Sequence, residues 1–242
     1  MASFNGTSAA PWQSLGASRP IQWEPFMRRI FLALAILIAA PLAQAQALWH
    51  EGQNYFLVSP AQAPSTGDKI EVLEVFSYAC IHCANFEPHL AAWKKNKPDN
   101  VEVVMMPAAW NPAWEFYARA YYTAEALKVL DKTHQALFNA LHIEHLQIRT
   151  VDDLTAFYAK YGVDPETFKQ TASSFAVETK LKRSKELVPR MGVRGTPEII
   201  VDGKYRFSVA TAGGSEKAAF ALLDFLIQKA ASERPKAEKA AP

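Results

Sequence analysis

The chain has 242 residues, of which 50% are hydrophobic and only two are cysteines. Its 26 basic and 24 acidic residues nearly cancel, giving a formal net charge of +2. This balance argues against a nucleic-acid-binding protein, which needs a basic excess to neutralise phosphates.

The first 45 residues have the features of a leader that is removed after export. The segment "MRRIFLALAILIAAPLAQAQA" begins at Met27 with two arginines, continues as an apolar run over residues 30–40, and ends in small residues. These are the three parts of a secretory signal peptide, and the run is shorter than the roughly 20 apolar residues that span a membrane. We expect Met27 to be the start, or the leader to be unusually long, with cleavage near Ala45 or Ala47. A buried helix or an uncleaved anchor fits these flanks less well.

Cleavage after Ala45 leaves a chain whose size and charge suit one exported domain. It removes three arginines and one glutamate, so that the remaining acidic and basic residues are equal in number. About 197 residues remain, which is enough for one domain or for one domain with a sizeable insertion. An exported protein meets an oxidising compartment, where thiols can form disulfides.

The chain after the leader predicts a strand, a helix and a second strand. The stretch "NYFLVSP" (54–60) predicts a short edge strand, and "KIEVLEVFSY" (69–78) predicts a central strand buried on both faces. Helical spacing follows from Cys83, with Pro88 expected to kink the helix. The stretch "VEVVMMP" (101–107) predicts the second buried strand. A βαβ unit of this kind implies that the two central strands are parallel.

A long helical segment follows this unit. From residue 111 to about residue 190 the patterns are helical, with a first-turn proline after Asn111 and a capping pattern that joins Thr150 to Asp153. We therefore expect residues 46–110 to form the first part of one domain and residues 111–190 to form an inserted helical subdomain.

The second part of the domain is expected over residues 191–230. Two strands, 198–201 and 205–208, are joined by an Asp202-Gly203 hairpin turn. An amphipathic helix then closes the fold at about Lys229, and we expect residues 231–242 to be a disordered tail.

The two cysteines, Cys80 and Cys83, lie where the first central strand runs into the helix. A disulfide that closes so short a loop restricts the unfolded chain little, so the pair is better suited to reaction or binding than to stabilisation. A Cys-x-x-Cys at this junction of a βαβ unit is typical of a thioredoxin-like redox motif. Unpaired N–H groups and the dipole of the helix favour the reactive thiolate of Cys80. His82 can add a hydrogen bond or a cation, which would make the disulfide a stronger oxidant.

Two segments of the chain resemble the DsbA family of bacterial periplasmic thiol:disulfide oxidoreductases. They are "EVFSYACIHCANFE" (74–87) and "MGVRGTPEIIVDGKY" (191–205), and the similarity extends in the same order over about residues 53–229. The resemblance implies an α/β fold of the thioredoxin type with an inserted all-helical subdomain.

The resemblance also implies roles for individual residues. In it Cys80 attacks, Cys83 resolves, and Pro197 is a cis-proline that faces the pair. Glu74 matches the buried acid beneath the active site, where burial would raise the pKa of a lone carboxylate. The plainer alternatives are that Glu74 pairs with a lysine, that Pro197 is an ordinary trans residue, and that His82 is only a polar residue at a helix start.

Substrate contacts are expected at three further positions, Ile81, Thr196 and Gly195. The best-known member of the family has proline where this chain has Ile81 and valine where it has Thr196. Both positions touch the sulfurs in that family, so these departures bear on the redox strength of the pair.

The resemblance implies an exported dithiol oxidase that works in the periplasm. It donates the Cys80–Cys83 disulfide through a mixed disulfide to folding exported proteins with free cysteines, and a membrane partner of the DsbB type reoxidises it. We expect a monomer that binds no nucleic acid and uses neither a cofactor nor a metal.

Two other functions remain open at this level. The same dithiol could serve a reductase or an isomerase. A dimeric isomerase of the DsbC kind needs an N-terminal dimerisation domain, however, and only about 20 residues lie between the expected cleavage site and the first central strand. A metal site formed by Cys80, Cys83 and His82 lacks the fourth ligand that zinc requires, and His142 and His145 have no carboxylate or cysteine near them in sequence. Haem c attachment is excluded because Ala84 stands where C-x-x-C-H needs histidine.

Overall fold

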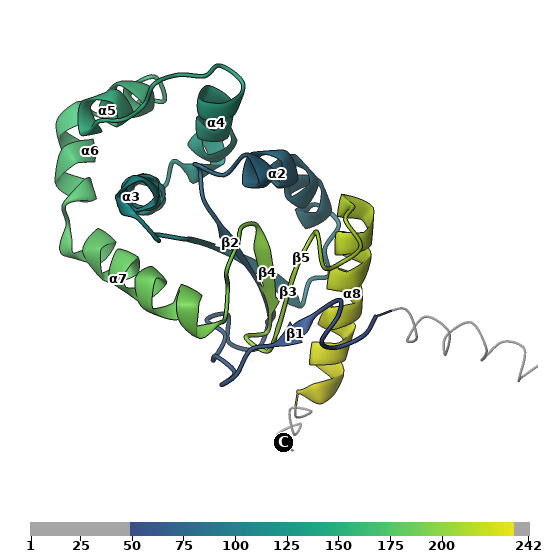
Figure 1. Cartoon of the computed structure of the whole chain (residues 1–242). Helices are drawn as coiled ribbons and strands as arrows, with labels where there is room; N and C mark the ends of the chain where they lie inside the picture. Colours follow the sequence, from purple (N-terminus) through teal and green to yellow (C-terminus); the bar gives the residue numbers. More distant parts are fainter. Residues whose placement is uncertain (1–48, 235–242) are drawn as a thin grey trace, which may run out of the picture. The chain divides into compact units, whose positions relative to one another are not determined.

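The computed structural model of the chain describes residues 49–234 (Figure 1). The leader, its start at Met27 and its cleavage near Ala45 or Ala47 lie outside the described residues, as does the end of the tail (235–242). The described part contains a five-stranded sheet with the order β1-β5-β4-β2-β3. The strands are β1 (Phe56–Leu57), β2 (Ile70–Phe76), β3 (Val101–Pro107), β4 (Glu198–Val201) and β5 (Tyr205–Ser208).

Strand pairing follows the expected βαβ unit at one side of the sheet and a hairpin at the other. Strands β2 and β3 are parallel, which confirms the prediction, whereas β4 pairs antiparallel with both β2 and β5. The edge strand β1 is only two residues long, shorter than the predicted 54–60. Pro60 cannot donate a backbone hydrogen bond, and the ladder ends before it.

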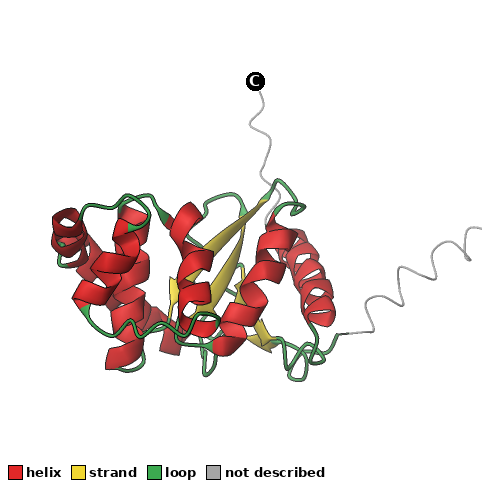
Figure 2. Ribbon diagram, turned by 90° about the horizontal axis from the view of Figure 1, so that it is seen from above, coloured by secondary structure: helices red, strands yellow, loops and turns green. Residues whose placement is uncertain are grey.

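The sheet is covered on both faces, so its central strand has no polar side facing water. Ile70 and Val72 of β2 pack with α2 (Ile81–Lys94) and α8 (Glu216–Glu233). Leu73 and Val75 point to the other face, where they pack with the end of α7 (Phe175–Arg190). Figure 2 shows helices on both sides of the strands. Because successive side chains of a strand point to opposite faces, this burial explains the nearly continuous apolar run of β2.

Five helices lie between β3 and β4 in the chain, as predicted for the inserted helical region (Figure 1). Asn111 and Thr150 accept hydrogen bonds from backbone N–H groups at the helix starts that they cap, and Thr150 forms the expected capping box with Asp153. The helices are α3 (Pro112–Ala126), α4 (Leu130–His142), α5 (Val151–Ala159), α6 (Pro165–Ala172) and α7.

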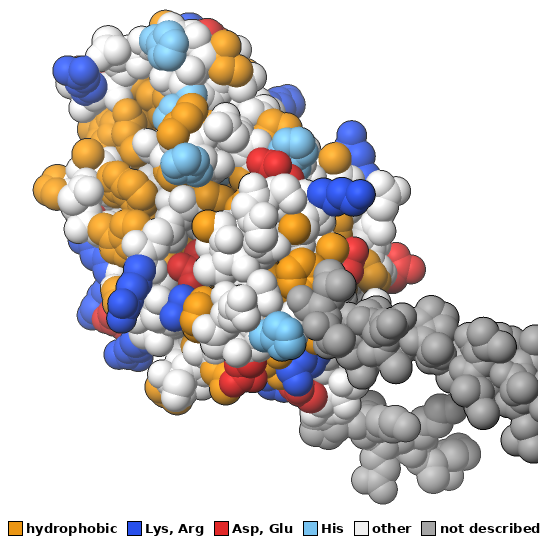
Figure 3. Space-filling view, turned by 45° about the vertical axis from the view of Figure 1, so that its right-hand side comes forward, with side chains coloured by type: hydrophobic (Ala, Val, Ile, Leu, Met, Phe, Trp, Pro, Cys, Tyr) orange, Lys and Arg blue, Asp and Glu red, His pale blue; other side chains and the backbone are white. Residues whose placement is uncertain are grey.

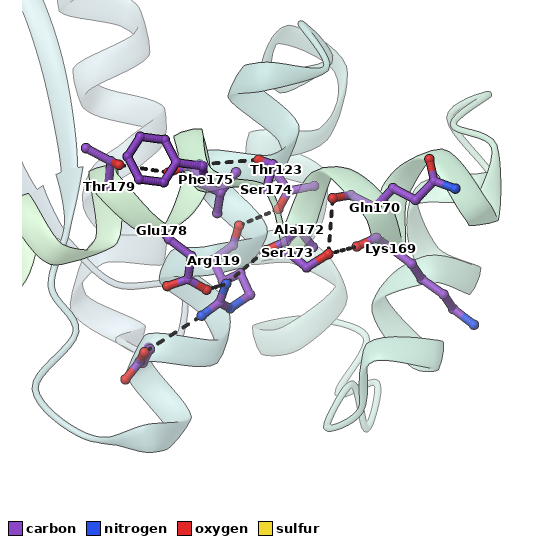
Figure 4. A network of polar contacts seen from close by, with 12 residues as sticks. Arg119, Thr123, Lys169, Gln170, Ala172, Ser173, Ser174, Phe175, Glu178 and Thr179 are labelled. Carbon is purple, nitrogen blue, oxygen red and sulfur yellow. Dashed lines mark hydrogen bonds and ion pairs between the residues drawn. The ribbon is translucent and has the colours of Figure 1, made fainter.

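A polar network ties three of these helices together. Arg119 of α3 donates to the carbonyl oxygen of Ala172, at the end of α6, at 2.8 Å, and it also pairs with the carboxylate of Glu178 in α7 (Figure 4). One guanidinium therefore fixes the corner where α6 gives way to α7.

The core of the helical region is continuous with the end of β2. Phe76, Tyr78 and Cys83 belong to the same buried cluster as Tyr121 of α3 and Phe138 of α4. The inserted helices therefore pack directly against the segment that carries the cysteine pair.

A second arginine, Arg234, binds the end of the last helix to the rest of the fold. Helix α8 continues to Glu233, beyond the expected end at Lys229, and the guanidinium of Arg234 pairs with both carboxylate oxygens of Asp202, at 3.1 and 2.5 Å. Arg234 also donates to the carbonyl oxygen of Lys69 at 2.7 Å. Within residues 49–234, no helix combines the length and the apolar character that crossing a membrane requires.

Replacing Arg234 with glutamine should lower the free energy of unfolding by about 3 kcal/mol, because it leaves the buried carboxylate of Asp202, 3% exposed, without its counter-charge. Lys169→Gln is the matched control, since it breaks an exposed ion pair with Asp152 and should change stability by less than about 1 kcal/mol. Urea unfolding measures both. Equal losses in the two variants would contradict the structural role given to Arg234.

Candidate active site

The two cysteines differ sharply in exposure. Cys80 is the N-cap residue of α2, with an extended backbone (φ −96°, ψ 114°), and its thiol is partly exposed. Cys83 lies one turn into the helix and is completely buried. Both are free thiols in this structure. A partner molecule can therefore reach the sulfur of Cys80 but not that of Cys83.

Hydrogen bonds to its sulfur lower the pKa of Cys80 to about 5. The largest contribution comes from the side chain of Cys83, and burial opposes it. The hydroxyl of Thr196 and the backbone N–H groups of Cys83 and His82 add further stabilisation of the thiolate. As a neutral thiol, Cys80 instead donates to the carbonyl oxygen of Thr196 at 3.3 Å. The Thr196 hydroxyl has no other hydrogen-bond partner among the described residues, so it is free to turn toward the sulfur.

The contribution of His82 differs from the expected one. Its backbone N–H stabilises the thiolate, whereas its imidazole is exposed and makes no hydrogen bond to Cys80. The reason is its place in the first turn, where the unpaired backbone N–H groups point along the helix axis toward the N-cap. The prediction of an anion-stabilising helix start agrees with this geometry, while a catalytic role of the imidazole stays a prediction.

Beneath the pair lies a buried carboxyl group, Glu74 of β2, whose side chain is 1% exposed. Burial and, second, the nearby Glu87 raise the pKa of Glu74 well above its usual range, while Lys94 opposes them. Glu74 makes no ion pair with Lys94; that lysine lies 4.0 Å from Glu87 instead. Burial also raises the pKa of Cys83, and its contact with Cys80 and the charge of Glu74 act in the same direction. A thiol and a carboxyl group, both protonated, thus lie together under the reactive sulfur.

The loop before β4 brings Thr196 and Pro197 to the cysteine pair. The Thr196–Pro197 peptide bond is cis, as expected, and Pro197 is buried while Gly195 is exposed. Thr196 contacts the sulfur of Cys80 directly. Ile81, the first residue of α2, is 46% exposed.

A surface pocket of about 520 Å³ begins at this loop. Near the cysteines it is lined by His82, Gly195, Thr196 and Pro197. Its lining also contains Glu198, which forms an ion pair of 2.7 Å with Arg206 of β5.

Sequence reasoning missed this charged pair. The available signal was a glutamate that directly follows Pro197 at the head of the otherwise apolar strand "EIIV". It also missed Glu87, whose signal was its position four residues after Cys83 in the same helix. His134 and Tyr78, which meet near Glu87, gave no local signal at all, because 56 residues separate them in the chain.

No metal site emerges in the part of the chain that the structure describes, where no group of three or more His, Cys, Asp or Glu side chains could hold an ion. His142 Nε2 lies 2.7 Å from the carbonyl oxygen of Tyr78, and His145 lies in the turn after α4 with φ 54°. Neither histidine belongs to a group of side chains that could hold an ion.

The sequence and the fold have close counterparts among known proteins. The DSBA-like thioredoxin domain matches residues 113–221. The thiol:disulfide interchange protein DsbA of Pseudomonas aeruginosa is 35% identical over 215 residues, covering 88% of this chain and 100% of that protein. DsbA of Pseudomonas syringae pv. tomato is 36% identical over 207 residues, covering 84% of this chain and 96% of that protein.

Solved structures give the same result. The crystal structure of Pseudomonas aeruginosa DsbA matches with a TM-score of 0.72 at 36% identity, covering 77% of this chain and 97% of that chain. The oxidoreductase DsbA from Xylella fastidiosa matches with a TM-score of 0.72 at 31% identity, covering 76% of this chain and 99% of that chain.

Titration of the reduced protein should show the ultraviolet absorbance of one thiolate appearing with a midpoint near pH 5, against about 8.5 for free cysteine. Because the pKa is lowered, the anion persists at every pH above that midpoint. Cys80→Ser should remove the transition. Thr196→Val should raise the midpoint by roughly one unit, since it removes one hydrogen bond to the anion. A midpoint at the free-cysteine value in the unsubstituted protein would contradict the geometry described here.

Proposed function

This chain belongs to the DsbA family and is a thiol:disulfide oxidoreductase, and from that premise we propose that it is an exported oxidase that gives its Cys80–Cys83 disulfide to other proteins. The observation that carries the proposal is the pKa of Cys80, lowered to about 5. A favoured thiolate stabilises the reduced form, so the disulfide form is the stronger oxidant.

The first step is attack on the accessible sulfur. A client thiolate attacks Cys80 Sγ, the Cys80–Cys83 bond breaks, and a mixed disulfide joins the client to Cys80. Cys83 leaves with the electron pair of the broken bond and needs a proton, because burial raises the pKa of its thiol. Glu74, held protonated by burial beneath the pair, is the group placed to supply that proton.

The second step releases the oxidised client. A second client thiolate attacks the client sulfur of the mixed disulfide, and Cys80 leaves as a thiolate that needs no proton at neutral pH. Its low pKa makes it a good leaving group. Two electrons have then passed from the client to the cysteine pair.

Clients are proposed to bind across the loop before β4 and the adjoining surface. Thr196, Gly195 and the pocket beside them lie next to Cys80, and Ile81 offers an exposed apolar contact. Figure 3 shows that one face of the molecule carries hydrophobic side chains among lysines and arginines, without placing them relative to this loop. Apolar contacts and backbone hydrogen bonds of this kind suit unfolded segments of varied sequence.

The proposal also includes the compartment in which the protein works and the partner that reoxidises it. The leader pattern that begins at Met27 supports export to the periplasm, where thiols of newly exported proteins are available for oxidation. A membrane partner of the DsbB type would accept the two electrons and restore the disulfide, and the protein would act as a monomer.

Equilibration of the purified protein with reduced and oxidised glutathione tests the direction of the reaction. Followed by tryptophan fluorescence, the protein should become reduced at mildly oxidising ratios, because the Cys80 thiolate favours the reduced state. A reduction potential near −270 mV, as in thioredoxin, would instead support a reductase.

Substitution of each cysteine tests the assignment of roles. Cys80→Ala should abolish the oxidation of a reduced client protein, since no accessible sulfur remains. Cys83→Ala, with Cys80 first converted by oxidised glutathione to its glutathione mixed disulfide, should exchange with a client thiol and release reduced glutathione. Mixed disulfides between Cys80 and the client should then accumulate, visible on non-reducing gels, because no Cys83 thiol remains to resolve them. Full activity of Cys80→Ala would show that the nucleophile has been assigned incorrectly.

A further inference from the structure

The loop of residues 192–197 connects α7 to β4 and brings Thr196 to the reactive sulfur. The carbonyl oxygen of Thr196 lies 3.3 Å from Sγ of Cys80. Its side chain, after that of Cys83, is the second side chain whose hydrogen bond lowers the pKa of Cys80. Arg194 and Gly195, which precede Thr196 in the loop, are exposed. Because a hydrogen bond weakens steeply when its geometry is lost, Thr196 can act on the sulfur only if the fold holds this loop in place.

One ion pair contacts the loop near its beginning and at its end. Arg206 of β5 pairs with Oε1 of Glu198, the first residue of β4, at 2.7 Å. The other oxygen of Glu198, Oε2, accepts a hydrogen bond of 3.4 Å from the backbone N–H of Arg194. The Arg206 guanidinium also lies against Gly192, where an added Cβ would come within 3.1 Å of Nε. The pair therefore joins the start of the loop to the residue that follows Pro197.

The surroundings of the ion pair restrict its movement. The guanidinium carbon of Arg206 lies over the ring of Phe56, 5.0 Å from its centroid. Gly192 has φ 75°, a conformation that favours glycine, and the missing side chain lets the guanidinium approach the backbone. The side chain of Glu198 is only 8% exposed. A guanidinium in contact with a ring, a carboxylate and a glycine backbone has little freedom, so it can give the loop a fixed position.

Stability alone does not account for a carboxylate at residue 198. Glu198 begins the strand "EIIV", whose other three side chains are apolar and buried. Replacing a buried ion pair with well-packed apolar residues is often neutral or stabilising. An apolar side chain would, however, supply neither the acceptor for the N–H of Arg194 nor the partner that holds Arg206 against the loop.

We propose that Glu198 and Arg206 are positioning residues, whose ion pair holds the 192–197 loop near its beginning and at its end and thereby fixes Thr196 against the sulfur of Cys80. This inference rests on the proposed function, in which the Cys80 thiolate is the leaving group. Both residues act through Thr196, and no bond of either residue changes during the reaction.

Glu198→Gln and Arg206→Gln test this role through the pH midpoint at which the Cys80 thiolate appears in the ultraviolet absorbance of the reduced protein. Both substitutions should raise the midpoint by about half a unit, because a loosened loop weakens the hydrogen bond from Thr196. An amide has only one oxygen, so Glu198→Gln cannot reproduce contacts that both carboxylate oxygens make.

The common direction of the two shifts distinguishes positioning from a direct effect of charge. Acting by charge alone, loss of the carboxylate would lower the midpoint and loss of the guanidinium would raise it. A rise in Glu198→Gln therefore supports the proposal even if Arg206→Gln does not fold. A lowered midpoint in Glu198→Gln would overturn it.

Arg234→Gln is the matched control, because Arg234 pairs with a carboxylate of similar burial, Asp202, and otherwise contacts the backbone of residues 67–69. It should lower the free energy of unfolding, as Arg206→Gln does, but leave the Cys80 midpoint unchanged. An equal shift of the midpoint in Arg234→Gln, or no shift in either Glu198→Gln or Arg206→Gln, would show a purely structural role and contradict the proposal.

The Thr196→Val background gives an independent test. Because the hydroxyl is already absent there, adding Glu198→Gln or Arg206→Gln should raise the midpoint no further. Additive rises would show that the pair acts on Cys80 without Thr196, against the proposal. The glutathione equilibrium of the unsubstituted protein separates this inference from the function on which it rests: a potential near that of thioredoxin would refute the oxidase, whereas the midpoints of the variants test the ion pair.

Discussion

The chemistry of this protein depends on an electrostatic difference between two sulfurs one helical turn apart. Cys80 caps α2, where backbone N–H groups of His82 and Cys83 stabilise its anion, and its pKa is lowered to about 5. Cys83 is buried in the apolar core, and its pKa is raised. A single turn of helix therefore separates a thiolate from a thiol. Helix α2 begins shortly after the carboxyl end of β2, within the unit formed by β2, α2 and β3, so the difference between the sulfurs follows from the βαβ unit itself.

The inserted helices pack against the cysteine pair and contribute to its chemistry. Their core includes Phe76, Tyr78 and Cys83, so the packing of α3 and α4 determines how deeply the second sulfur is buried. A loss of apolar contacts there would admit water and reduce the desolvation that raises the pKa of Cys83. The helical region thus affects the redox chemistry through the local dielectric, independently of any contact it makes with clients.

Features with a local physical cause could be predicted from the sequence, and those that depend on long-range packing could not. The buried strand β2, the parallel pair and the helix start at Cys80 follow from apolar patterns and spacing within about 40 residues. The sequence points to the imidazole of His82, and the backbone N–H of the same residue, which stabilises the Cys80 thiolate, could not be predicted, because a sequence does not show the direction of backbone N–H groups. The meeting of Tyr78 with His134 depends on how α4 packs against β2, which no pattern within either segment determines.

Oε2 of Glu74, Oε2 of Glu87 and Nε2 of His134 are buried without a hydrogen-bond partner among the described residues. Unpaired carboxyl oxygens suit a site that must hold and replace a proton. Leaving a buried polar group unpaired costs about 1–3 kcal/mol. The charge of Glu74 disfavours ionisation of Cys83, so in the proposed mechanism the proton of Glu74 moves to the sulfur when the disulfide opens. That transfer leaves a buried carboxylate beside Glu87, a state that must be neutralised before the centre can return to its starting charge. Lys94, whose charge opposes the rise in the pKa of Glu74, is the nearby cation that stabilises this carboxylate until a proton returns.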